Sequence, residues 1–129
     1  MLANLVALAV ASAIALSASQ AFPVIGATYQ LDRAKYPGRV AVCTTEAAMS
    51  AYAEAEARRD QAAMKRMVMN VSTMADLNAM KKAEACTMVS SSSQAKIIEK
   101  GIEAHKAEFA AFALTPMWGH YLYFGGRVR

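Results

Sequence analysis

The start of this sequence lacks charge, since no Asp, Glu, Lys, Arg or His occurs from Met1 to Leu31. Leu5 to Leu16 is almost wholly apolar, and small residues ending in Ser19-Gln20-Ala21 follow it. The apolar run is shorter than the roughly twenty residues that span a bilayer, and the small residues suit a signal-peptidase site. We therefore predict a signal helix over residues 1–21, removed on export, and one small domain over residues 22–129.

The same region also lacks the Lys or Arg that ordinarily precedes the apolar core of a signal peptide. The charge-free stretch runs on past residue 21, so a membrane anchor over residues 2–25 is the alternative. Pro23 and Gly26 would interrupt such a helix, because proline removes a backbone hydrogen bond. Export to the periplasm or the medium is the favoured prediction, and an accessory subunit anchored in the membrane by its N-terminal segment is the rival.

Cysteine is scarce: the chain has Cys43 and Cys86 only, and they do not form a C-x-x-C pair. Their wide separation argues against a thioredoxin-like redox motif. In an oxidising compartment the two thiols are expected to pair. Closing a loop of this length would stabilise the fold by about 4 kcal/mol in the chain-entropy model.

Catalytic motifs are missing as well, and no Gly-x-Ser-x-Gly elbow is present. His105 or His120 could serve a cysteine nucleophile only if a thiol were free, which export opposes. We therefore predict no enzymatic activity and no cofactor.

Charge is moderate, with 14 basic and 10 acidic residues and a net charge of +4. Basic pairs at Arg58-Arg59, Lys65-Arg66 and Lys81-Lys82 would form one stripe only on a continuous helix. We expect a bend near Asp60, and hence a solvated basic face. The expected partner is an envelope protein or a cell-wall or membrane surface, and nucleic acid is not expected outside the cytosol.

The middle of the chain predicts a strand and then helices. Residues 36–39 have turn chemistry, and residues 39–43 alternate as in a short strand. Thr44 or Thr45 can cap a helix over residues 46–58, in which Glu54 and Arg58 can pair. Asp60 can cap a second helix, and Thr73 with Asp76 resembles a capping box for a third that ends before Cys86.

Strand signals dominate after Cys86. Serine fills positions 90–93, which predicts a loop, and residues 95–100, 106–114 and 117–124 are candidate strands. A helix over residues 103–113 is the alternative for the second of them.

The nine methionines include a cluster of Met64, Met67 and Met69. Thioethers are soft ligands, so in an exported protein these residues could bind Cu(I), with His105 and His120 completing the site. Methionine also fills irregular helix interfaces, and this is the favoured interpretation. A copper-handling protein is therefore kept as an alternative function.

Aromatic side chains gather near the C-terminus, where Trp118, Tyr121 and Tyr123 lie close together. Aromatic residues favour strands and supply much of the buried area of a small domain. If they are exposed they mark an interaction surface. We predict this surface as the working part of the molecule.

The layout resembles small exported bacterial proteins that carry a Src-homology-3-like barrel. The resemblance rests on Cys43, the helices at 46–69, Cys86 and the strand candidates through Trp118 and Gly119. It implies a binding or structural module without catalytic residues.

The predicted fold class is α+β. The signal helix and a helical hairpin or three-helix segment, within the Cys-bracketed part 39–86, precede a small antiparallel sheet or barrel-like part over 95–129. The predicted function is an exported, non-enzymatic binding or structural module.

Overall fold

The computed structural model describes residues 22–112 and 115–129, so the predicted signal segment over residues 1–21 lies outside the described part. The described residues form one antiparallel sheet and three α-helices. The strands are β1 (Thr28–Leu31), β2 (Arg39–Cys43), β3 (Cys86–Ser90), β4 (Gln94–Lys100), β5 (Ala104–Phe109), β6 (Met117–His120) and β7 (Phe124–Arg127). The helices are α2 (Glu46–Ala57), α3 (Gln61–Met67) and α4 (Met74–Lys82), with 3-10 turns η1 (Ala110–Phe112) and η2 (Tyr121–Tyr123).

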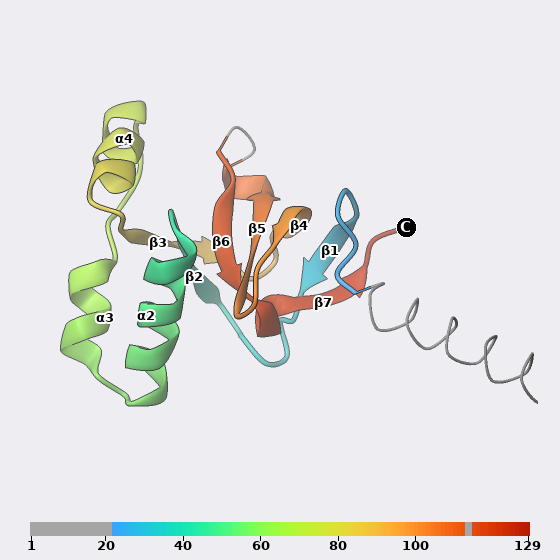
Figure 1. Cartoon of the computed structure of the whole chain (residues 1–129), viewed down its shortest axis with the longest axis horizontal. Helices are drawn as coiled ribbons and strands as arrows, with labels where there is room; N and C mark the ends of the chain where they lie inside the picture. The colour runs from blue at the N-terminus through green and yellow to red at the C-terminus, as the bar shows by residue number, and fades with distance from the viewer. Residues whose placement is uncertain (1–21, 113–114) are drawn as a thin grey trace, which may run out of the picture.

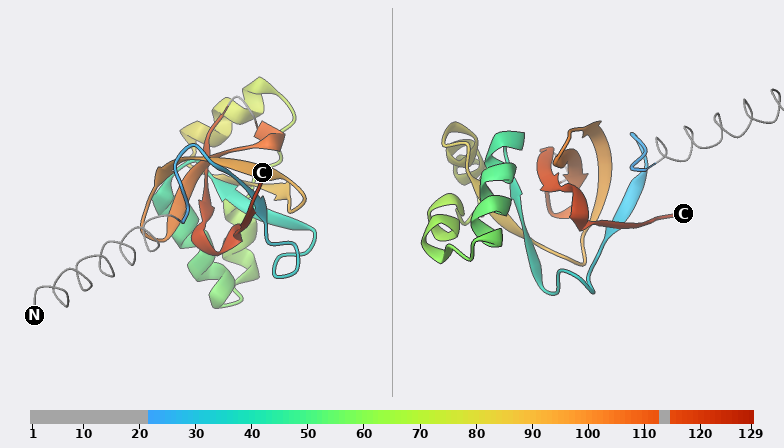
Figure 2. Two further views of the ribbon diagram at one scale, coloured as in Figure 1. Left: turned by 90° about the vertical axis from the view of Figure 1, so that its right-hand side faces the viewer. Right: turned by 60° about the horizontal axis from the view of Figure 1, so that its bottom comes forward.

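The seven strands are ordered β3-β2-β6-β5-β4-β1-β7 in the sheet. β1 lies between β4 and β7, and β2 lies between β3 and β6. The helices gather at one end of the molecule, with α2 between α3 and the sheet, while β1 and β7 lie at the opposite end (Figure 1). Figure 2 shows the same separation and the strong curvature of the strands.

The predicted fold class, in which helices precede a separate C-terminal sheet, is wrong. The molecule is mostly β, and its helices are an insertion between β2 and β3 of one sheet. β1 and β2 precede the helices but pair with strands that follow them, for example β1 with β4 and β7. Such non-local pairing leaves no local pattern, which is why the sequence did not reveal it.

The predicted helix starts are confirmed. Thr45 rather than Thr44 caps α2, since its hydroxyl accepts the Ala48 N–H at 3.0 Å. The hydroxyl of Thr44 instead donates to the Ala85 carbonyl at 3.3 Å. Asp60 caps α3 in the same way, at 3.1 Å from the Ala63 N–H.

The bend between α2 and α3 is also confirmed, because Arg59 has a φ of 56° and ends the first helix. The basic pairs at Arg58-Arg59 and Lys65-Arg66 are therefore not on one continuous helix. Their side chains are exposed, as are those of Lys81-Lys82 in α4. The predicted ion pair within α2 is present, with 3.7 Å between Glu54 Oε1 and Arg58 Nη1.

The C-terminal strands differ in part from the prediction. β4 matches its expected segment, as does β2 before the helices. The expected strand over residues 106–114 is a strand rather than the alternative helix, but its bounds are wrong: β5 spans Ala104–Phe109, and the 3-10 turn η1 follows it. The expected single strand over residues 117–124 is wrong: β6 ends at His120, and η2 separates it from β7. The break is local, because the His120 side chain accepts the Leu122 N–H at the start of η2.

The core is one cluster of buried side chains that come from the strands, from α2 and from α4. Met49 and Tyr52 of α2 are buried there, whereas α3 contributes no fully buried residue. The largest buried side chains are those of Tyr29, Phe109, Leu31, Met49, Met80, Ile97 and Met117. Leu77 and Met80 of α4 are buried as well, so α2 and α4 together anchor the insertion, and the exposed face of α2 shapes the surface.

Candidate ligand-binding groove

A disulfide joins the end of β2 to the start of β3, and so closes the helical insertion at its base. Cys43 and Cys86 are opposite residues of β2 and β3, both fully buried, and they are bonded to each other. The predicted disulfide is thus confirmed, and neither cysteine has a free thiol. A structural disulfide is typical of proteins in oxidising compartments. It points to an exported location for this chain.

Residues 22–112 and 115–129 contain no helix with the length and apolar character needed to cross a bilayer. Most of the alternative anchor over residues 2–25 lies outside these residues.

The three aromatic residues predicted as an interaction surface differ in their exposure. Tyr121 is 44% exposed, Trp118 is half-buried against the core, and Tyr123 is only 3% exposed. Burial of Tyr123 raises the pKa of its phenol, and the nearby Glu56 acts in the same direction. Of the three, Tyr121 alone is an exposed residue.

Tyr121 and Tyr123 line a groove between the η2 corner and the outer face of α2. The groove consists of two adjoining hollows of about 780 and 240 Å³, which share Ala53 and His120 as lining residues. Small side chains of α2 form one wall, and aromatic and apolar side chains form the other. We call this the α2–η2 groove; its residues are Tyr36, Ala47, Ser50, Ala51, Ala53, Glu54, Glu56, Ala57, Glu103, His120, Tyr121, Leu122 and Tyr123.

The centre of the groove is His120. Its Nδ1 accepts the N–H of Leu122 at 3.3 Å, so in the neutral imidazole the proton is assigned to Nε2. The centroid of its ring lies 4.7 Å from the ring centroid of Tyr121 and 5.9 Å from that of Tyr123. Burial lowers the pKa of His120, although the negative charge of Glu103 opposes this. The ring is therefore uncharged at neutral pH.

Tyr36 brings the loop between β1 and β2 to the same groove. Its ring makes an edge contact with Tyr123, at 4.9 Å between centroids. Burial raises the pKa of Tyr36, and the charges of Glu56 and Asp32 add to this effect. Tyr36 is therefore a neutral phenol at any physiological pH, held in place by a buried neighbour.

The charged side chains that line the α2–η2 groove are all acidic: Glu54, Glu56 and Glu103. Three other hollows of the described surface each contain basic residues, at Arg33, at Arg39, and at Lys81 with Lys106. The acidic groove is therefore a local departure in a chain whose net charge is +4.

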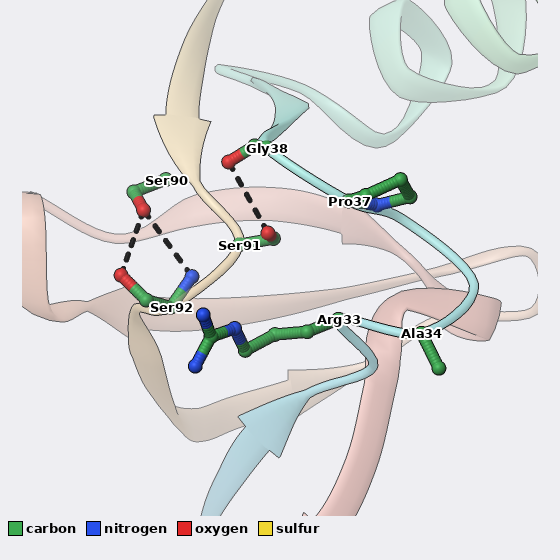
Figure 3. Close-up of a pocket in the computed structure, with 7 residues that line it drawn as sticks. All are labelled: Arg33, Ala34, Pro37, Gly38, Ser90, Ser91 and Ser92. Atoms are coloured by element: carbon green, nitrogen blue, oxygen red, sulfur yellow. Dashed lines mark hydrogen bonds between the residues drawn. The ribbon is translucent and has the colours of Figure 1, made fainter.

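A second hollow lies between the β1–β2 loop and the turn after β3, where Arg33 extends across the opening toward Ser92 (Figure 3). Its serine groups are already engaged. The Ser91 N–H and hydroxyl both donate to the Gly38 carbonyl, at 2.9 and 3.1 Å, and the hydroxyls of Ser90 and Ser92 are 2.7 Å apart. These bonds tie two turns together, so the hollow is better explained as a structural junction than as a ligand site.

The methionine cluster packs against the protein. Met64, Met67 and Met69 are all half-buried and in contact with the core. In the described part of the chain, no group of three His, Cys, Asp or Glu side chains is placed to hold a metal ion. The burial of the methionines favours their role in packing.

The sequence indicates Tyr121 and Tyr123 for an interaction surface, and His120 only as a possible copper ligand or catalytic histidine. Tyr36 and the wall from α2 were missed. The small residues of this wall recur on one face of the helix and can be seen in the sequence, but only the fold places them opposite η2.

Comparisons of this chain with protein-family models, with curated proteins and with solved structures give no match.

Proposed function

We propose that this protein is an exported, non-enzymatic binding module, and that it binds its ligand in the α2–η2 groove. The observation that carries the proposal is the groove itself, where exposed Tyr121 and Leu122 face the small side chains of α2. A concave surface with aromatic and apolar lining and a few polar groups is the usual form of a binding site.

Export is supported by the buried disulfide between Cys43 and Cys86 and by the charge-free N-terminal segment. Intact-mass spectrometry of protein from the producing cell tests this part. We expect a mature chain that begins at Phe22 and has both thiols protected until reduction. A full-length chain with two free thiols would contradict export.

The groove is tested by site-specific photo-crosslinking in the producing cell. A photoreactive phenylalanine analogue replaces Tyr121, and the same analogue at the exposed Lys96 of β4 serves as the control position. We expect a discrete adduct from position 121 that position 96 does not give.

A blocking variant makes this test specific. Ala53 lines both hollows, so Ala53→Trp should fill the groove and abolish the adduct at position 121. The matched control is Ala62→Trp, which adds the same side chain to an exposed site on α3. An adduct that persists in Ala53→Trp, or no adduct at all, would overturn the proposed site.

A further inference from the structure

We propose that the α2–η2 groove binds a peptide segment of a partner protein that carries Lys or Arg side chains. This inference rests on the proposed function and adds the chemistry of the partner. Three observations support it: the sign of the charges that line the groove, the exposed ring of Tyr121 beside the half-buried ring of His120, and the apolar surface that runs alongside them.

The charge argument comes from Glu56 and Glu103, which lie on opposite walls. Both are exposed, and no described hydrogen bond or ion pair engages either side chain. Glu54 is partly neutralised, since Arg58 lies 3.7 Å from it. Two carboxylates without a described partner therefore face a groove whose lining has no Lys or Arg. Complementary charge speeds the encounter with a basic segment and disfavours an acidic one.

The aromatic argument comes from the paired rings of His120 and Tyr121. Tyr121 is 44% exposed, so its ring is accessible to a cation, which is attracted to the negative face of an aromatic ring. Because His120 is uncharged at neutral pH, it adds no repulsion there. Glu103, which also lines this hollow, acts on His120 electrostatically.

The apolar argument favours a peptide over a small free cation. Ala47, Ala51 and Ala57 line the helical wall, and Leu122, 39% exposed, lies across from them. Lys and Arg bury their aliphatic stems against such surface while the charged group stays with the carboxylates. The hollows adjoin through Ala53 and His120, so one extended segment can occupy both.

The test uses a fluorescently labelled peptide of alternating Lys and Ala, and a matched peptide with Glu in place of each Lys. Binding is measured by fluorescence anisotropy at low ionic strength, where surface charges are least screened. We expect the basic peptide to bind and the acidic peptide not to bind. The basic peptide should shift the backbone amide resonances of His120, Tyr121 and Leu122.

Variants assign the effect to the groove. Glu56→Gln with Glu103→Gln should weaken binding of the basic peptide by about fivefold to tenfold, given the energies of exposed charge pairs. Glu84→Gln with Glu99→Gln removes the same charge from exposed sites outside the groove and should change binding less than about twofold. Tyr121→Ala should weaken binding, whereas Tyr121→Phe, which keeps the ring, should not.

The outcomes separate the two proposals. If the acidic peptide binds the groove as well as the basic one, or Glu56→Gln with Glu103→Gln has no effect, the partner chemistry is wrong and the groove remains a binding site. If spermidine competes with the basic peptide and binds as tightly, the ligand is a free polycation instead. If neither peptide shifts the groove resonances and position 121 gives no cellular adduct, both proposals fail.

Discussion

The imidazole of His105 is 6% exposed, and its Nδ1 is the buried polar side-chain atom without a hydrogen-bond partner in the described structure. Burial lowers the pKa of His105, and the positive charge of Lys100 and the nearby His120 act in the same direction, while Glu46 opposes them. The unfolded imidazole therefore binds a proton more readily than the folded one. The free energy of unfolding therefore has its full value above the pKa of the unfolded imidazole, about 6.5. It decreases as the pH falls from there through the lower pKa of His105 in the folded protein.

We expect the melting temperature of the protein to fall between pH 7.5 and pH 5, and His105→Leu to reduce the slope of that fall. Differential scanning calorimetry across this range provides the measurement. His120→Gln is measured for comparison. Burial also lowers the pKa of His120, so this second histidine contributes to the same fall in melting temperature. A slope in His105→Leu equal to that of the unaltered protein would show that His105 is not the group responsible.

Gly119 lies so close to buried aromatic rings that there is little room for a side chain at this position. A Cβ there would lie 2.9 Å from Cζ of Phe109 and 3.3 Å from Cδ2 of Tyr123, and both rings are buried. Gly119→Ala should therefore cost about 1 to 3 kcal/mol of unfolding free energy through overpacking, measured by urea denaturation. Gly126→Ala is the control, since a Cβ at Gly126 would meet nothing within 4 Å. Equal stabilities of the two variants would contradict the prediction.

At the scale of elements, α4 depends on its first turn. The Thr73 hydroxyl accepts the Asp76 N–H at 3.1 Å, and the Asp76 carboxylate accepts the Thr73 N–H at 3.2 Å. Thr73→Ala removes the cap and should cost about 1 kcal/mol, measured by denaturant unfolding. Thr73→Ser keeps the hydroxyl and should retain most of that stability. If Ser destabilises as much as Ala, the hydrogen bond is not the cause.

The helices could be predicted from the sequence because their signals are local. Thr45, Asp60 and Thr73 each act within the first turn of the helix they cap, so a few adjacent residues specify each start. β1 could not be found in this way. Its residues Thr28–Leu31 belong to the charge-free stretch, and they are held by β4 and β7, both far away in the sequence. The α2–η2 groove was missed for the same reason.

At the scale of the whole molecule, the disulfide closes a loop with a sequence separation of 43. Reduction should lower the free energy of unfolding by about 4 kcal/mol, because the unfolded chain regains the freedom that the cross-link removes. Guanidinium denaturation with and without reductant measures the difference. Cys43→Ala with Cys86→Ala should show the reduced stability in both conditions. Identical unfolding of the oxidised and reduced protein would contradict this account.

The same bond has a consequence for proteolysis. Arg58 and Arg59 are exposed at the bend between α2 and α3, a typical position for attack by a trypsin-like protease. This bend lies inside the loop that Cys43 and Cys86 close. A cut there would produce two polypeptides that stay covalently joined and separate only when a reductant is added.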